Sequence, residues 1–344
     1  MRRLFPLAAV AALTASLACI STAHAVSCSV GAALPGEARS ALFEAAHQMG
    51  GDVLRGDVPA LKAATIPSVA SSFDGIAGTV STLAPTLGGA TLTVTNLYAL
   101  DANDLQGTQD DVQFFCSVPG ASQLVTVTLG ELPKGQFALV ILHATGIKAP
   151  QQFALILQNT APSATAPAAT TQVTVPHWQL AGFFARPLTI DGHDSVWFWQ
   201  QARALKGKAQ PLSAFLYDQA AAYLARPADL YTSNNLQKLS RETASVEPAG
   251  LPGNNPMVVP ADGQSFAVTA LRADGTLGAL DLRVDTKVGS VADPVAARKD
   301  ALALMAALLK EHAELRANFH GLWVYENTAA GQTFAVEQPM SALP

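Results

Sequence analysis

The chain has 344 residues, of which 49% are apolar and 14% charged, and its formal net charge is −5. This length suggests about two domains with hydrophobic cores of their own. Lys and Arg form no cluster, which argues against nucleic acid as a partner because phosphate binding requires concentrated positive charge. After the N-terminus no run approaches about 20 apolar residues, so no transmembrane segment is expected.

Residues 1–25 predict a secretory signal peptide. Two arginines precede an apolar stretch, and the sequence Ala-His-Ala at 23–25 fits the small-residue rule for cleavage after it. A lipoprotein signal ending at Cys19 is the alternative, but Ser16 stands where that signal has a bulky aliphatic residue. We therefore expect a secreted or periplasmic protein, of the bacterial envelope if periplasmic.

Two cysteines remain after that cleavage, Cys28 and Cys116. In an oxidising compartment an even pair of cysteines predicts one disulfide bond. The alternatives are a pair of metal-binding thiolates or a nucleophile, and both need neighbouring partner residues that the sequence does not supply.

Residues 36–87 have the apolar spacing of helices. The first helix is expected to end at Gly50-Gly51. A second begins at Asp57-Val58-Pro59, with Asp57 or Val58 near the cap and Pro59 in the first turn, and a third follows near residues 72–74.

From residue 90 to residue 191 the apolar period changes to two, which predicts strands. Turn-forming residues separate the runs and the connections are short, so an antiparallel meander is expected. Residues 158–176 are rich in Ala, Pro and Thr and predict a flexible loop. The predicted strands are 91–95, 112–116, 124–128, 137–142, 153–157 and 178–190.

Helices followed by a curved antiparallel sheet are the layout of the NTF2-like, or cystatin-like cone, superfamily. The stretch HWQLAGFF at 177–184 looks like the closing strand of such domains, and Gly51-Asp52 and Gly56-Asp57 are similar to the family's early helical turn. The resemblance covers residues 34–192. It implies a conical pocket between helices and sheet, in a superfamily that includes isomerases, dehydratases and non-catalytic binding modules. No catalytic pair of that family is matched residue by residue.

His193, Asp194 and Ser195 stand side by side, which raises the question of a hydrolase triad. Triad side chains must converge on one point, whereas consecutive residues point in different directions. Asp and Ser are also preferred at a helix N-cap, and the sequence has no GxSxG nucleophile motif. We therefore expect a helix start here. Helices at 195–205 and 211–224 would form a hairpin within an extension at 193–244, with core anchors at Trp197, Phe198 and Trp199.

Residues 245–263 are dense in Pro, Gly and Asn and predict a linker between domains. The remainder, 264–344, predicts a ββαββ domain with strands at 266–271, 280–285, 322–325 and 333–336. The Asp274-Gly275 step favours a hairpin turn. Asp293-Pro294 begins a long helix that Gly321 ends. In the second strand, Asp281, Arg283 and Asp285 are expected to face water.

Six histidines follow the predicted cleavage site, and none forms a short metal-ligand pair such as HxH or HExxH. No metal site and no cofactor are therefore predicted. The acidic loop at 101–111 lacks EF-hand spacing and is interpreted as a solvated loop, with calcium binding as the alternative. His143 is the weak catalytic candidate. By alternation it shares a strand face with Phe137, Leu139 and Ile141, and it would reach the pocket if that face lines the cone.

The leading hypothesis is a non-enzymatic α+β protein that acts as a binding or envelope-accessory module for a small apolar ligand or a protein partner. The first alternative is a pocket enzyme, an isomerase or a hydrolase, with His143 as general base. The second is a structural envelope scaffold.

Overall fold

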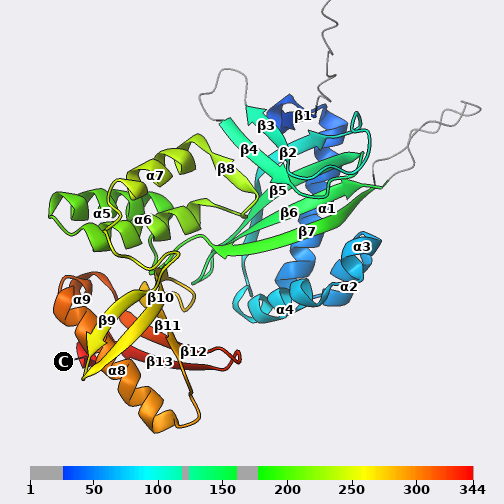
Figure 1. Cartoon of the computed structure of the whole chain (residues 1–344). Coiled ribbons are helices and arrows are strands. Elements are labelled where there is room, and N and C mark those ends of the chain that lie inside the picture. The colour runs from blue at the N-terminus through cyan, green and yellow to red at the C-terminus, as the bar shows by residue number, and fades with distance from the viewer. Residues whose placement is uncertain (1–25, 118–123, 161–176, 344) are drawn as a thin grey trace, which may run out of the picture.

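The computed structural model describes residues 26–117, 124–160 and 177–343. Within these ranges the chain is a mixed α+β protein with two five-stranded sheets and one three-stranded sheet, all open (Figure 1). The same ranges contain no helix that is both long and apolar enough to cross a membrane. The predicted signal peptide at 1–25, and the loop predicted at 158–176 from residue 161 onwards, lie outside the described residues and stay predictions.

The first sheet has the strand order β1-β2-β5-β6-β7, and every neighbouring pair in it is antiparallel. Its strands β5 and β6 are buried on both faces, which explains their nearly unbroken apolar sequences. The strands are β1 (Ser27–Val30), β2 (Thr91–Asp101), β5 (Gln136–Thr145), β6 (Gln151–Asn159) and β7 (Trp178–Pro187).

Helices cover one face of this sheet (Figure 1). They are α1 (Gly36–Arg55), α2 (Val58–Ala63), α3 (Pro67–Ala70) and α4 (Asp74–Leu83). The helix α1 continues through Gly50 and Gly51, so the predicted stop there is wrong. A Cβ at Gly50 would lie 2.6 Å from a methyl of Leu92, so this glycine lets α1 pack closely on the sheet. The helix ends instead at Arg55, and its C-cap residue Gly56 has a left-handed φ of 69°.

The opposite face of the sheet is covered by a second layer of strands, in the order β3-β4-β8. These strands are β3 (Val112–Ser117), β4 (Leu124–Leu129) and β8 (Tyr231–Ser233). The predicted antiparallel pairing is confirmed, and β5, β6 and β7 pair consecutively, but the meander is interrupted because β2 pairs directly with β5 and the β3–β4 hairpin leaves the sheet. The predicted disulfide is confirmed: Cys28 of β1 and Cys116 of β3 are bonded, and the bond links the two layers.

Three helices follow, α5 (Ser195–Gly207), α6 (Pro211–Ala225) and α7 (Asn234–Ala244). Asp194 is the N-cap of α5, and its Oδ1 accepts a hydrogen bond from the backbone N–H of Trp197 at 2.9 Å, which confirms the cap interpretation. His193 stacks on the Trp197 ring at a centroid distance of 3.7 Å. The predicted hairpin is present as α5 and α6. The strand β8 and the helix α7 are additional elements within the extension predicted at 193–244.

The second five-stranded sheet has the order β13-β12-β11-β10-β9, with β11 and β12 parallel and the other pairs antiparallel. Its strands are β9 (Met257–Ala261), β10 (Gln264–Asp274), β11 (Asp281–Val288), β12 (Gly321–Thr328) and β13 (Thr333–Pro339). The strand β9 lies in the range predicted as linker and extends the predicted ββαββ order. Its Pro260 is tolerated because β9 is an edge strand.

The helix α8 (Pro294–Glu311) covers one face of this sheet and is followed by the short helix α9 (Leu315–Asn318). Asp293 caps α8 as expected, because its Oδ1 accepts hydrogen bonds from the backbone N–H groups of Val295 and Ala296. The single long helix that was predicted up to Gly321 is interrupted after Glu311. Asp281 and Asp285 are buried and do not face water, which corrects a further prediction.

Candidate functional site

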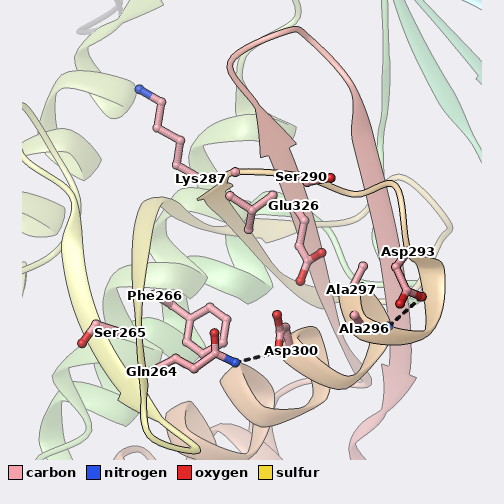
Figure 2. A pocket seen from close by; sticks show the side chains of 12 residues that line it. Gln264, Ser265, Phe266, Lys287, Ser290, Asp293, Ala296, Ala297, Asp300 and Glu326 are labelled. Carbon is pink, nitrogen blue, oxygen red and sulfur yellow. Dashed lines mark hydrogen bonds between the residues drawn. The ribbon is translucent and has the colours of Figure 1, made fainter.

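A cavity of about 370 Å³ opens between the N-terminal half of α8 and the second sheet (Figure 2). Its walls come from the start of β10, the end of β11, the loop into α8 and the strand β12. A volume of this size is within the range of small-molecule sites in proteins. The residues that line it are Gln264, Ser265, Phe266, Lys287, Val288, Gly289, Ser290, Asp293, Ala296, Ala297, Asp300 and Glu326.

Glu326 is the unusual residue of this cavity. It continues the inward-facing row of Leu322 and Val324 on β12, a position that alternation normally gives to an apolar side chain. Its side chain is buried, with the residue 1% exposed, and its Oε1 has no hydrogen-bond partner. A buried carboxylate without a partner is costly, so burial raises the pKa of Glu326 to about 7 and the negative charge of Asp300 adds to the shift.

Two further carboxyl groups line the cavity from α8. Asp300 is half-buried, and its Oδ1 accepts a hydrogen bond from Gln264 Nε2 at 2.8 Å. Asp293 is the N-cap residue of α8 at the other side of the opening. In Figure 2 the Glu326 carboxyl group points from β12 towards α8, where both aspartates lie. Three carboxyl groups from two elements therefore give the cavity an acidic lining.

Lys287 is the one basic residue among the lining residues, and it is exposed. Its amine points away from Glu326 (Figure 2). Ser265 and Ser290 add hydroxyl groups near the opening. This arrangement suits an occupant that carries positive charge and donates hydrogen bonds, because such a group satisfies Glu326 and offsets the charge of Asp300.

His143 lies on β5 and shares its face with Phe137, Leu139 and Ile141, as the alternation predicted. That face packs against the β3-β4-β8 layer and not against helices α1 to α4. Burial lowers the pKa of His143, so the ring is neutral at neutral pH. The structure therefore does not place His143 between the helices and the sheet, where the proposed cone would have its pocket.

The acidic loop at 101–111 makes local turn contacts. The Oδ1 of Asp101 accepts a hydrogen bond from the backbone N–H of Asn103 at 2.9 Å, an interaction typical of a turn. The left-handed φ of 52° at Asp111 marks a second turn, just before β3.

The structure brings together residues that sequence reasoning did not combine. Asp281, His320 and Glu337 each offer one metal-ligating atom, and these atoms lie within 4.8 Å of one another. No linear motif could have revealed this group, since its members are distant in the sequence. Glu326 did leave a signal, because it interrupts an alternating apolar strand at an inward position. Comparison of the chain with protein-family models, curated proteins and solved structures found no match.

Proposed function

We propose that this chain is an exported binding protein that holds a small, positively charged amine in the Glu326 cavity. The observation that carries the proposal is the buried Glu326 carboxyl group, which has an oxygen without a hydrogen-bond partner and lines an acidic cavity. An ammonium group supplies both the hydrogen-bond donors and the charge that Glu326 lacks. The sequence led us to expect a small apolar ligand or a protein partner, whereas this lining favours a small polar ligand.

Export is part of the proposal. It rests on the predicted signal peptide at 1–25 and is supported by the Cys28–Cys116 disulfide, since such bonds persist in oxidising compartments. The NTF2-like resemblance of residues 34–192 is likewise proposed. It is supported by the helices α1 to α4, which precede the sheet and pack on one of its faces. The layer β3-β4-β8 on the other face is additional to that layout.

The side chains between helices α1 to α4 and the first sheet form an apolar cluster, which argues for placing the ligand elsewhere in the chain. The cluster contains Leu42, Ala46, Met49, Val53, Val140, Leu142, Phe153, Leu155 and Leu157, among others. We therefore assign ligand binding to the C-terminal part of the chain. For the N-terminal part we propose a structural role, so the proposal combines the binding hypothesis with the scaffold hypothesis.

The test measures binding of putrescine to tag-free mature protein by calorimetry, with succinate as the anionic control. We expect binding of putrescine and none of succinate. The variant Glu326→Gln should weaken putrescine binding by at least about tenfold, because it removes the charged acceptor. Affinity should also be lower at about pH 5 than at about pH 8, since the protonated Glu326 cannot pair with a cation.

The matched control is Asp218→Asn, which removes another buried carboxyl group that is not among the residues lining the cavity. This variant should bind putrescine like the natural chain. Equal affinities of the natural chain and the Glu326→Gln variant would contradict the assignment, as would binding that is independent of pH. Native mass spectrometry of the purified protein gives a second readout, a co-purifying amine that the Glu326→Gln variant lacks.

A further inference from the structure

We propose that Asp281, His320 and Glu337 form a Zn²⁺-binding site, independent of the Glu326 cavity. Their ligating atoms lie within 4.8 Å of one another, and they comprise one imidazole nitrogen and two carboxylate oxygens. Asp281 is buried, while His320 and Glu337 are exposed. The cation would therefore lie at the surface, with one ligand anchored in the interior.

Strand pairing positions each of the three residues. The parallel register of β11 and β12 places Asp281, the first residue of β11, beside the start of β12. Glu337 of β13 lies opposite Trp323 of β12 in the antiparallel register. The backbone of His320 is fixed on both sides: its N–H donates to the Leu280 carbonyl, and its carbonyl accepts from the Met340 N–H, both at 2.9 Å. The ligands are thus held by the sheet and not by a loose loop.

The contact between His320 and Asp281 has a length that suits two ligands of one zinc ion. The Nδ1 of His320 and the Oδ1 of Asp281 are 3.1 Å apart. Two atoms that each bind one Zn²⁺ at about 2.0–2.1 Å in tetrahedral geometry are themselves about 3.3 Å apart. A Cβ at position 321 would lie 3.0 Å from Asp281 Oδ1, so Gly321 leaves room for this carboxylate. The other oxygen of Asp281 accepts a hydrogen bond from Trp323 Nε1 at 3.2 Å, which fixes the orientation of the carboxylate.

The donor set favours zinc over calcium or magnesium. An imidazole ligand suits Zn²⁺, whereas Ca²⁺ and Mg²⁺ take oxygen ligands in larger numbers. The two carboxylates offset both positive charges of the ion. Three protein ligands with an open fourth position are the arrangement of zinc sites that accept a water or another molecule, in contrast to the closed structural sites with four ligands.

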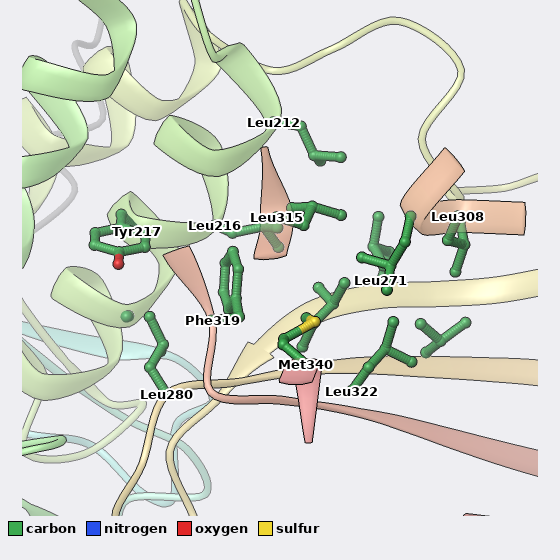
Figure 3. Close-up of a cluster of buried hydrophobic side chains, with 14 of the residues drawn as sticks. Leu212, Leu216, Tyr217, Leu271, Leu280, Leu308, Leu315, Phe319, Leu322 and Met340 are labelled. Atoms are coloured by element: carbon green, nitrogen blue, oxygen red, sulfur yellow. The ribbon is translucent and has the colours of Figure 1, made fainter. Parts of the chain in front are cut away.

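The proposed site shares His320 with the lining of a second cavity, of about 250 Å³. Its walls are largely aromatic, from α5, α6 and the segment before β12. Tyr217 and Phe319 meet there edge to face, with Leu280 beside them (Figure 3). The remaining lining residues are Asp191, His193, Trp197, Phe198, Ala317 and Asn318. A small molecule with one oxygen or nitrogen donor and an apolar body would fit between the zinc and these rings.

The experiment titrates Zn²⁺ into tag-free protein with its disulfide intact, in competition with a chromophoric chelator. We expect one Zn²⁺ per chain. His320→Ala and Glu337→Gln should each weaken binding by about tenfold or more, and Trp323→Phe, which removes the hydrogen bond to Asp281, by about tenfold. A visible spectrum of the Co²⁺-loaded protein provides a second readout, which changes in these variants if the residues are ligands.

The control is His312→Ala, which removes a histidine that lies beside a single carboxylate, Glu314, at 3.6 Å. Its zinc affinity should equal that of the natural chain. Glu337 is exposed on the edge strand β13, so Glu337→Gln should keep the fold, and a circular dichroism melt without metal checks this for every variant. The absence of bound zinc overturns the proposal. It is also overturned if folded His320→Ala and Glu337→Gln variants bind zinc like the natural chain.

Discussion

At the scale of single residues, two carboxyl groups in the interior stand out, Glu326 and Asp218. Each is buried and each has one oxygen without a hydrogen-bond partner. Burial raises the pKa of Asp218 to about 6, and the negative charge of Glu242 adds to the effect. Both groups therefore ionise near neutral pH at a cost to the folded state. For Glu326 the proposed function explains why this cost is tolerated, because a cationic ligand in the cavity would pair with the ionised carboxylate.

The first prediction concerns the pH dependence of stability. The pKa of Glu326 is about 7 in the folded chain, against an ordinary value of 4.5. Between these values the folded state holds a proton that the unfolded state has lost, so this group's contribution to stability falls as pH rises. At about pH 8 the free energy of unfolding of the Glu326→Gln variant should therefore exceed that of the natural chain by on the order of 2 kcal/mol.

At about pH 3 the carboxyl group is protonated in both states, and the difference between the two proteins should nearly vanish. Urea unfolding of both proteins at the two pH values measures this difference in the free energy of unfolding. A Glu326→Gln variant that is less stable than the natural chain at high pH would show that Glu326 has a favourable partner in the folded protein.

At the scale of elements, the disulfide is the link that defines the N-terminal part. Cys28 lies on the edge strand β1 and Cys116 on β3, so the bond joins the first sheet to the layer that covers it. The two cysteines are 88 residues apart in the sequence. The strand β1 has four residues and pairs with β2, and the covalent bond adds a link from it to β3.

The second prediction is the effect of removing this bond. For a loop of this length the chain-entropy model gives a stabilisation of roughly 4–5 kcal/mol. In denaturant unfolding, the double variant Cys28→Ser, Cys116→Ser should be less stable than the natural chain by an amount of this order. Adding a reductant should not change the stability of the double variant. Mass spectrometry of the natural protein after alkylation without reduction should show no modified cysteine. Two alkylated cysteines in the folded, exported protein would contradict the bond.

At the scale of the whole molecule, the helices α5 to α7 and the C-terminal sheet share one apolar cluster. Leu212 and Leu216 of α6 face Leu308 of α8, Leu315 and Met340 across this cluster (Figure 3). The same helices also reach the N-terminal part, because β8, which precedes α7, pairs with β4. The predicted helical extension and the predicted C-terminal domain are therefore packed on one another.

The third prediction follows from this shared cluster. Leu216 is fully buried, so Leu216→Ala should lower the free energy of unfolding by about 3 kcal/mol. Hydrogen exchange should then rise in α5 and α6 and, to a similar extent, in β10 to β12 and α8, because one cluster stabilises all of them.

The comparison is Leu42→Ala in α1, which removes a buried leucine of the N-terminal cluster. It should raise exchange in α1 and in the first sheet and leave β10 to β12 unchanged. Faster exchange confined to α5 and α6 in the Leu216→Ala variant would mean that the helices and the C-terminal sheet unfold separately.

The sequence by itself determined the features whose causes are local. Asp57, Asp194 and Asp293 cap helices at the starts that the sequence predicted, because a cap needs only the backbone N–H groups of the next turn. The alternation on β5 correctly gave the face of His143, and the pair of cysteines left after the predicted cleavage gave the disulfide. Only the tertiary structure decided which strands pair, so the departure of β3 and β4 from the first sheet and the membership of β9 in the second were not predictable.

The same limit applies to the candidate sites. Glu326 of β12 and Asp300 of α8 line one cavity. Asp281, His320 and Glu337 come from three segments that the β11–β12–β13 register aligns. Sequence patterns report on the interactions of residues that are close together along the chain, within one helix, strand or turn. A cavity or a metal site is set by contacts between elements, and these depend on how the whole chain packs its apolar side chains.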